Sequence, residues 1–370
     1  MPKFLPTLSL LAAALGALGP TGARAAEPPA GTLAQLLADS GITASGYVAA
    51  SYYTSSGGNT FHQFDTAHEA FQLDQAGLTL AYQPKQGFGA LIDTIAGDDA
   101  KIVNAAESAS ASSNNPIDIL QGFVQYVDGA LTVQAGKFTT LAGAEVIAPT
   151  GNSNFSRSFL FYAEPMTHTG VRATYAFDRA VSLIVGVNNG WNYTSVSSGS
   201  KTVELGIALN PTASLSFTAQ SYIGNDPVDL TRRTLIDTVA TYNVTAALQV
   251  VASYDWGRQR PSAVTAGGQW SGVALYVNER LSSRWRVSVR GESFDDRNGF
   301  VTGTAQRLKE ATLTLGYDPT ADFELRIEGR YDTSNRPTFL YVHTDPATGR
   351  TLTDYSAHQS EFAVQGVYSF

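Results

Sequence analysis

Apolar and polar side chains alternate along one segment of the chain after another, and this alternation restricts the fold to β-structure. The segment Phe323–Tyr331, FELRIEGRY, has apolar side chains at 323, 325, 327 and 331 and charged ones at 324, 326, 328 and 330. Neighbouring side chains of a strand point to opposite faces, so this strand has one apolar and one charged face. In a soluble sandwich the charged face meets water, whereas in a membrane barrel the apolar face meets lipid.

The connections between the predicted strands alternate between short and long. Seven short turns lie at 84–86, 128–129, 178–179, 210–212, 243–245, 282–283 and 318–320. Longer polar or Gly-rich segments lie at 55–68, 97–116, 138–169, 192–201, 225–231, 257–269, 295–307 and 333–358. This rhythm predicts an all-β fold, a transmembrane up-and-down antiparallel β-barrel of about sixteen strands, with tight turns on one side and loops on the other. Fourteen or eighteen strands also fit the pattern.

Composition and the positions of aromatic residues favour the membrane barrel over the sandwich. Charged residues make up 15% of the chain, against about 25% in typical soluble domains. Aromatic side chains recur at the ends of the predicted strands, as in the girdles of membrane barrels. They are Tyr82, Tyr126, Tyr175, Phe177, Tyr242, Tyr317, Tyr368 and Phe370 on the short-turn side, and Trp191, Trp256 and Trp270 on the loop side.

The first 41 residues are expected to lie outside the barrel. Lys3, the apolar run 4–18 and the small-residue site 23–25 are typical of a secretory signal peptide, 1–25. Residues 26–41 are then a periplasmic leader with a short helix at 33–39, and the barrel spans 42–370. The formal charge of −8 becomes about −10 once Lys3 and Arg24 are removed with the signal peptide. This acidity argues against nucleic-acid binding.

The sequence ends in an alternating strand with Tyr368 and a terminal Phe370. This ending resembles the C-terminal signature of Gram-negative outer-membrane proteins. The resemblance implies a protein of the bacterial outer membrane, surrounded by its lipid. It also implies that the barrel assembly machinery recognises Phe370.

The third long connection, 138–169, differs from the others in its length and its apolar residues. Connections of about 30 residues without secondary structure are uncommon and are usually functional. Phe155, Phe159, Leu160 and Phe161 would be unusual on a free external loop. We therefore expect this loop to fold into the barrel and pack against its wall.

Residues in and around this loop form a recognisable block. They are Gly136, Lys137, Phe138, Thr140, Gly143, Glu145, the segment NSNFSRS at 152–158, Pro165, His168, Gly170 and Arg172. The block resembles the OmpL-like family of outer-membrane β-barrel porins, although Phe155 stands where that family often has Tyr. The resemblance implies a water-filled channel, narrowed by the third loop, for passive diffusion of small hydrophilic solutes or ions. Porins of this general kind are typically homotrimers, but the sequence identifies neither a subunit interface nor the solute.

Charged residues inside the predicted barrel are candidates for selecting what passes, because rings of charged side chains set channel selectivity. The expected constriction residues are Glu145, Arg157 and Glu164, and the expected lining residues are Arg172, Arg286, Arg290, Glu292, Glu310, Glu324, Arg326, Glu328 and Arg330. The wall charges either pair with one another and stiffen the wall, or form a basic strip that faces acidic loop residues. Arg157 has a structural alternative, which is to hold the loop through backbone carbonyls or Glu145.

The sequence offers less support for other functions. The five histidines, His62, His68, His168, His343 and His358, belong to no catalytic or metal-binding motif. No enzyme activity, cofactor or metal is therefore expected, and His168 is expected to form a structural hydrogen bond. The remaining alternative is a non-conducting outer-membrane barrel that acts as an adhesin or structural protein through its external loops. Large apolar side chains inside the barrel would favour that alternative, whereas predicted inner residues such as Gln125, Thr132 and Thr218 are polar.

Overall fold

The computed structural model describes residues 37, 39–108, 112–263, 265–344 and 349–370. The predicted signal peptide, 1–25, and most of the predicted leader lie outside these residues. Leu37, Asp39 and Ser40 are helical, at the end of the helix expected at 33–39. Gly41 follows with a φ of +70°, a left-handed conformation that favours glycine and commonly ends a helix.

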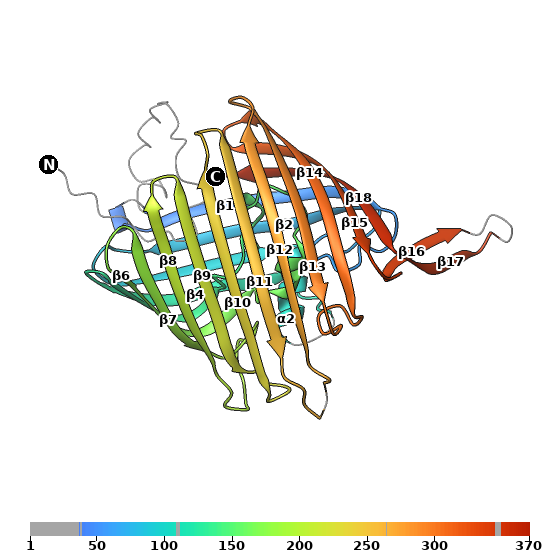
Figure 1. Cartoon of the computed structure of the whole chain (residues 1–370). Coiled ribbons are helices and arrows are strands. Elements are labelled where there is room, and N and C mark those ends of the chain that lie inside the picture. The colour runs from blue at the N-terminus through green and yellow to red at the C-terminus, as the bar shows by residue number, and fades with distance from the viewer. Residues whose placement is uncertain (1–36, 38, 109–111, 264, 345–348) are drawn as a thin grey trace.

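Sixteen antiparallel strands close into one barrel (Figure 1). The strands are β1 (Thr43–Ser55), β2 (Ala70–Tyr82), β3 (Gly87–Ala96), β4 (Ile117–Asp128), β5 (Leu131–Thr139), β6 (Thr167–Ala176), β7 (Val181–Asn188), β8 (Thr202–Thr212), β9 (Leu215–Asn225), β10 (Arg232–Asn243), β11 (Leu248–Gln259), β12 (Gly268–Arg280), β13 (Trp285–Asp296), β14 (Gln306–Thr320), β15 (Phe323–Ser334) and β18 (His358–Ser369). Successive barrel strands are neighbours, and the barrel closes between β1 and β18, with Tyr47 opposite Ser369. The all-β class, the antiparallel barrel and the number of strands confirm the prediction from sequence.

Two further strands lie outside the barrel sheet. β16 (Phe339–Thr344) and β17 (Thr351–Ser356) form a hairpin within the connection from β15 to β18. The hairpin projects away from the barrel (Figure 1), and Tyr341, Leu352 and Tyr355 are exposed on it. This hairpin was not predicted, because residues 333–358 were expected to form a loop.

The alternating pattern sorts the side chains of each strand as expected. On β15, Ile327 and Tyr331 are 42% and 49% exposed on the outer face, whereas Arg326 and Glu328 on the inner face are 2% and 1% exposed. An apolar outer band and a polar inner face are what a barrel in lipid requires. The exposed aromatic residues at the short-turn ends are Tyr82, Tyr126, Tyr175, Phe177, Tyr242, Tyr368 and Phe370. Tyr317 is partly exposed.

Three tryptophans were predicted to form a girdle on the loop side, and this prediction is wrong for Trp191 and Trp270. Trp270 is 1% exposed inside the barrel. Its ring meets the ring of Trp191 edge-on at 6.3 Å and stacks on Phe300 at 5.3 Å. The prediction assumed a wet interior at this level, but the loops fold over it and make an inward tryptophan favourable. Trp256 is partly exposed on the outer face.

Two helices inside the long connections were not predicted. α2 (Asp98–Glu107) lies between β3 and β4, and α3 (Phe159–Ala163) lies between β5 and β6, after the 3-10 turn η1 (Pro149–Gly151). α2 begins with two acidic residues, which favour a helix N-terminus, and buries Ala100 and Val103. A helix this short depends on tertiary packing, and its periodic pattern is too brief to recognise. No helix in the described part of the chain is long and apolar enough to cross a membrane.

The connections keep the predicted order of seven short turns and eight long loops. β8 and β14 continue through the prolines at 211 and 319, with register shifts at those positions. Proline has no N–H for a regular ladder, so the strands are irregular there. The two turns therefore lie a few residues later than predicted.

Candidate functional site

The third long loop folds into the barrel, as expected. It spans residues 140–166, between β5 and β6, and is called L3 below. Phe155, Phe159, Leu160 and Phe161 are only 1–7% exposed. Phe159 and Leu160 pack with wall residues Trp270, Phe294 and Leu308 in one apolar cluster. A loop buried in this way needs protein partners for its backbone N–H and C=O groups, because water does not reach them.

The wall residue Glu328 binds two consecutive backbone N–H groups of L3. Its carboxylate oxygens accept from Phe155 at 2.6 Å and from Ser156 at 2.9 Å. Beside it, the Asn154 amide donates to the Thr314 hydroxyl at 2.6 Å. The middle of L3 is thus tied to β14 and β15.

The wall residue Glu292 holds the start of α3. Its carboxylate accepts from the N–H groups of Phe159 and Leu160, both at 2.7 Å. The Ser158 hydroxyl caps the same helix by accepting from the Phe161 N–H at 3.1 Å. A carboxylate at a helix N-terminus satisfies N–H groups that have no partner within the helix.

Wall arginines donate hydrogen bonds to the backbone carbonyls of L3. The pairs are Arg286 with Ser153 (2.6 Å), Arg326 with Pro149 (3.0 Å) and Arg330 with Arg157 (2.5 Å). Each arginine also pairs with a wall carboxylate: Arg286 and Arg326 with Glu324, and Arg330 with Asp332. The wall charges therefore pair with one another and hold L3 at the same time.

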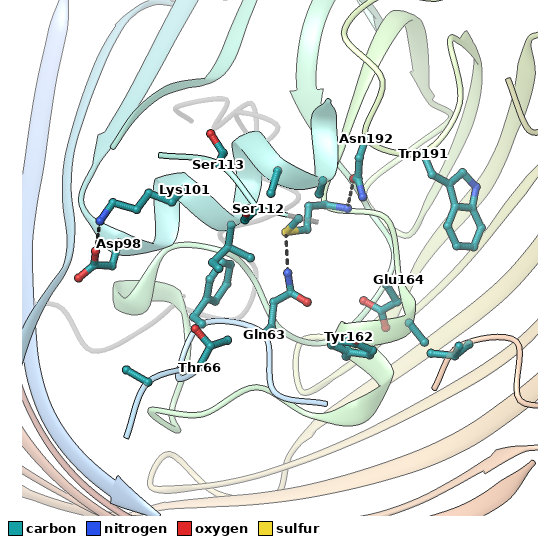
Figure 2. Close-up of a pocket in the computed structure, with 18 of the residues that line it drawn as sticks. Gln63, Thr66, Asp98, Lys101, Ser112, Ser113, Tyr162, Glu164, Trp191 and Asn192 are labelled. Carbon is teal, nitrogen blue, oxygen red and sulfur yellow. Dashed lines mark hydrogen bonds and ion pairs between the residues drawn. The ribbon is translucent and has the colours of Figure 1, made fainter. Parts of the chain in front are cut away.

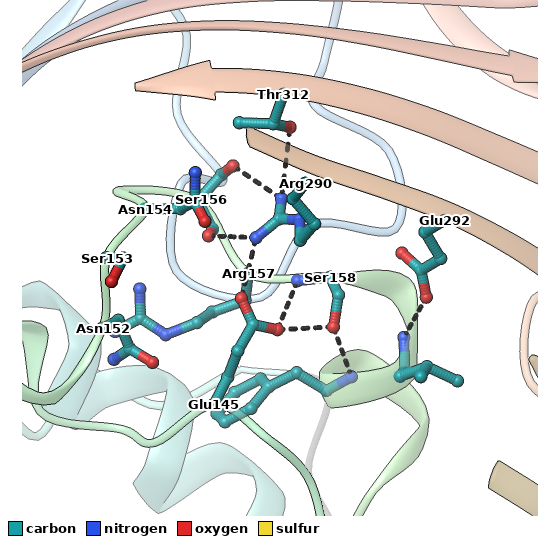
Figure 3. A network of polar contacts seen from close by, with 12 residues as sticks. Glu145, Asn152, Ser153, Asn154, Ser156, Arg157, Ser158, Arg290, Glu292 and Thr312 are labelled. Carbon is teal, nitrogen blue, oxygen red and sulfur yellow. Dashed lines mark hydrogen bonds and ion pairs between the residues drawn. The ribbon is translucent and has the colours of Figure 1, made fainter. Parts of the chain in front are cut away.

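Arg290 is the centre of the network (Figure 3). Its guanidinium pairs with the L3 residue Glu145 at 2.7 Å and with Glu310 at 2.8 Å, and it donates to the Ser156 carbonyl at 2.7 Å. Glu145 also accepts from the Ser158 N–H at 2.8 Å. Because all of these groups are buried, removing one partner would leave the others without compensation.

Arg157 holds the shape of L3 from within. Its side chain donates to the backbone carbonyls of Val146, Phe155 and Ile147 at 2.6–3.0 Å. The guanidinium also lies 5.5 Å from the centre of the Phe64 ring. These contacts match the structural alternative considered for Arg157.

A second polar group lies where L3 leaves β5 and joins β6. Arg172 pairs with Glu204 at 2.9 Å and lies 4.1 Å from the centre of the Phe138 ring. The Tyr222 hydroxyl donates to Glu204 at 3.1 Å and accepts from the backbone of L3 at 3.0 Å. The His168 ring stacks on Tyr222 at 4.5 Å and bonds a backbone carbonyl at 3.0 Å, which is the structural role expected of it.

A cavity of about 800 Å³ lies beside L3 (Figure 2). L3, α2 and the connections after β1, β7 and β13 border it, and its charged lining residues are Asp98, Lys101, Glu164 and Arg233. The Arg233 guanidinium lies over the ring of Trp191 at 5.2 Å. Both signs of charge and several aromatic rings therefore face one space.

The twelve predicted site residues all lie inside the barrel, and most are covered. Ten are less than a tenth exposed: Glu145, Arg157, Glu164, Arg172, Arg290, Glu292, Glu310, Arg326, Glu328 and Arg330. Arg286 and Glu324 are partly exposed, with side chains at 14% and 18%. Of the predicted constriction residues, only Glu164 borders the cavity.

Two inner aspartates were not among the predicted site residues. Asp237 on β10 and Asp255 on β11 lie directly opposite each other, and both are 0% exposed. Together with Glu164 of L3 they form a group in which one carboxylate oxygen from each residue lies within 4.8 Å of the others. The only signal in the sequence was an aspartate at an inward position near the middle of two successive strands.

The closed barrel, its apolar outer band and its inward third loop define the class: an outer-membrane barrel with the architecture of porins. The model of the family Putative beta-barrel porin-2, OmpL-like, matches residues 41–370. The chain belongs to this family, and it is a protein of the bacterial outer membrane. A search of curated proteins finds no significant match to the chain.

Solved porin structures share the fold at low sequence identity. The anion-selective porin from Comamonas acidovorans superposes with a TM-score of 0.62 and 11% identity, over 89% of this chain and 99% of that chain. OmpT of Vibrio cholerae gives 0.60 and 10%, over 89% and 97%, and one similar structure is its trimer form. OprB of Pseudomonas putida gives 0.59 and 13%, over 91% and 96%. At such identities the likeness shows the fold alone.

Proposed function

We propose that this protein is a porin whose barrel conducts small hydrophilic solutes or ions by passive diffusion. One observation supports this most. The wall charges hold L3 against β13, β14 and β15, and a cavity with charged and polar lining lies beside the held loop. In this proposal the held loop narrows the passage, and the cavity beside it is the part of the lumen that stays open.

In this proposal the segment 138–169 is the constriction, and its charged residues divide into two roles. Glu145 and Arg157 hold L3 in place, as do the wall residues Arg290, Glu292 and Glu328. Glu164 borders the cavity and contacts passing solutes, so its charge favours cations. The protein has no enzymatic activity, and it assembles as a homotrimer.

Conductance of the refolded protein in planar bilayers tests the channel. We expect ohmic single-channel steps from the wild type. The double variant Glu292→Gln/Glu328→Gln should show larger or noisier conductance. A glutamine amide offers one acceptor where the carboxylate offers two, so each substitution leaves one L3 N–H facing an NH₂ group. L3 then loses its hold on the wall.

The matched control is Asp93→Asn, the same carboxylate-to-amide change at an inner position of β3. Asp93 accepts from Thr79 and Gln121, which lie on β2 and β4 and not in L3, so conductance should stay close to that of the wild type. In a KCl gradient, Glu164→Gln should shift the reversal potential away from cation preference. Well-folded wild-type protein that remains silent would contradict the proposal.

Such silence would favour the non-conducting adhesin or structural barrel. One observation supports that alternative, because large apolar side chains do occupy the lumen near L3. They include Phe159, Leu160, Trp270, Phe294, Leu308 and Phe339. The apolar residues of L3 were expected inside the barrel, but the inward wall residues were expected to be polar, and Trp270, Phe294 and Leu308 are not.

A further inference from the structure

The carboxylates of Glu164, Asp237 and Asp255 form a buried acidic group for which the structure shows no counter-charge. Asp237 and Asp255 lie opposite each other on adjacent strands, a position in which like charges are destabilising. No ion pair in the described part of the chain involves any of the three. The acids that hold L3 differ from this group, because each of them has an arginine or a backbone N–H partner. They are Glu145, Glu292, Glu310 and Glu328.

The donors near these oxygens are poorly placed: the Gly143 N–H approaches Asp237, and Asp255 approaches the other two carboxyl groups. Both carboxylate oxygens of Asp237, both of Asp255 and Oε2 of Glu164 are buried without a hydrogen-bond partner. Glu164 is the independent member: it comes from L3, is 7% exposed, and places one carboxylate oxygen within 4.8 Å of an oxygen of each wall aspartate. Buried ionised carboxylates without partners are very costly, so such a group either stays protonated or holds a cation.

The spacing of the oxygens suits a single cation. One oxygen from each residue lies within 4.8 Å of the others. Two oxygens bound to one Ca²⁺ at about 2.3–2.6 Å can be at most about 5 Å apart. Carboxylates are the ligands that hard divalent cations prefer, and a site with three of them disfavours softer metals.

The local backbone leaves room for the Glu164 carboxylate. Gly143 has a φ of +85°, and a Cβ at that position would collide with the Glu164 carboxylate. Glu164 also borders the cavity, so an ion arriving from the cavity meets this carboxylate first.

We propose that Glu164, Asp237 and Asp255 bind one hard divalent cation, with Ca²⁺ as the representative ion. The cation joins the end of L3 to β10 and β11, two strands from β13, where Arg286 and Arg290 hold the middle of the loop. It therefore completes the attachment of L3. The proposal does not depend on conduction, because the site would bind its ion in a silent barrel as well.

The test uses the full-length mature protein. It is refolded in detergent without lipopolysaccharide, and bound metal is then removed with a chelator. Calorimetric titration with CaCl₂ should show one saturable site per chain. Tb³⁺, which replaces Ca²⁺ at oxygen sites, should give luminescence excited through tryptophan, because Trp191 and Trp270 line the same cavity as Glu164. Added Ca²⁺ should also raise the unfolding temperature of the wild type.

The variants Asp237→Asn and Asp255→Asn keep side-chain shape and remove a charged ligand. Each should weaken Ca²⁺ binding at least about tenfold and abolish the Ca²⁺-dependent rise in unfolding temperature. Both variants should fold, because they relieve repulsion in the ion-free protein. The matched control is Asp93→Asn, an inner aspartate of β3 that is bonded to Thr79 and Gln121, and it should bind Ca²⁺ like the wild type. Absence of saturable binding in the wild type, or equal binding in all variants, would overturn the proposal.

Discussion

Individual charged side chains inside this barrel act mainly on backbone groups. Glu292 and Glu328 each accept two N–H groups of L3, and Arg286 and Arg326 donate to its carbonyls. A buried ion pair alone is weak evidence of stability, since desolvation offsets the attraction. Here each charge also satisfies a backbone group that has no access to water. The sequence could place these residues on the inner face but could not show this role, because their partners are more than 130 positions away.

At the residue scale, the outer face gives a direct prediction at Ile327. Its side chain is 42% exposed on the outside of β15, between Leu315 of β14 and Val364 of β18. Ile327→Arg should lower the free energy of unfolding by about 2–4 kcal/mol, because it places a charge on the lipid face. Reversible denaturant unfolding in lipid vesicles measures this change. Ile327→Val is the control and should cost under about 1.5 kcal/mol; equal costs for the two variants would show that Ile327 does not face lipid.

At the element scale, the strands were predictable and the structured parts of the loops were not. A strand pattern such as that of β15 is local, with period two, and needs no knowledge of its neighbours. α2 has only ten residues and is stabilised by the wall on which it packs. The inward position of Trp270 likewise depends on loops distant in sequence. L3 was predictable as an inward loop because its phenylalanines have no favourable place outside.

The first long loop, L1 (56–69), is anchored by an ion pair that responds to pH. The His62 ring is fully buried, with Nδ1 2.5 Å from Asp65 and Nε2 2.8 Å from Asp332. Burial and the Arg330 guanidinium lower the pKa of His62, but Asp65 and Asp332 outweigh them, and the net pKa lies above 6.5. Burial raises the pKa of Asp65, yet the His62 charge outweighs burial and holds it below 3.8.

The anchoring of L1 should therefore be complete between pH 3.8 and pH 6.5 and weaken at more acidic and more alkaline pH. The contribution of His62 is fully present below pH 6.5 and is lost as the pH rises through its raised pKa. The contribution of Asp65 is present above pH 3.8 and is lost as the pH falls through its lowered pKa. Hydrogen exchange of residues 56–69, corrected for intrinsic rates, should show the opening free energy falling by about 1.5–3 kcal/mol at alkaline pH.

Two variants separate this effect from general loosening of the barrel. His62→Phe should remove the pH dependence of exchange in L1 and leave exchange fast throughout. His68→Gln changes a histidine of the same loop whose ring bonds the Ser55 hydroxyl, and the pH dependence should remain. If His62→Phe retained the wild-type profile, another group would be the one that titrates.

At the scale of the whole molecule, backbone pairing between the first and last strands closes the barrel. Phe370 and Gly46 exchange backbone hydrogen bonds, N–H to O, at 2.9 and 3.0 Å. The Phe370 ring is 66% exposed and lies over Gly46, where a Cβ would collide with it. Residue 370 therefore extends the β1–β18 ladder through its backbone, and its ring remains available on the outer surface for another partner.

This arrangement predicts that the Phe370 ring serves assembly more than stability. Phe370→Ala keeps the backbone bonds to Gly46, so protein refolded in detergent should retain its heat-modifiable mobility and lose less than about 1 kcal/mol of unfolding free energy. In cells, the amount of folded protein in the outer membrane should fall several-fold, because we expect the assembly machinery to recognise this ring. Phe362→Ala removes another outward ring from the same strand, 48% exposed, and should leave assembly unchanged. If Phe370→Ala impaired refolding in detergent as strongly as it impaired assembly in cells, the ring would be a structural element of the closed barrel.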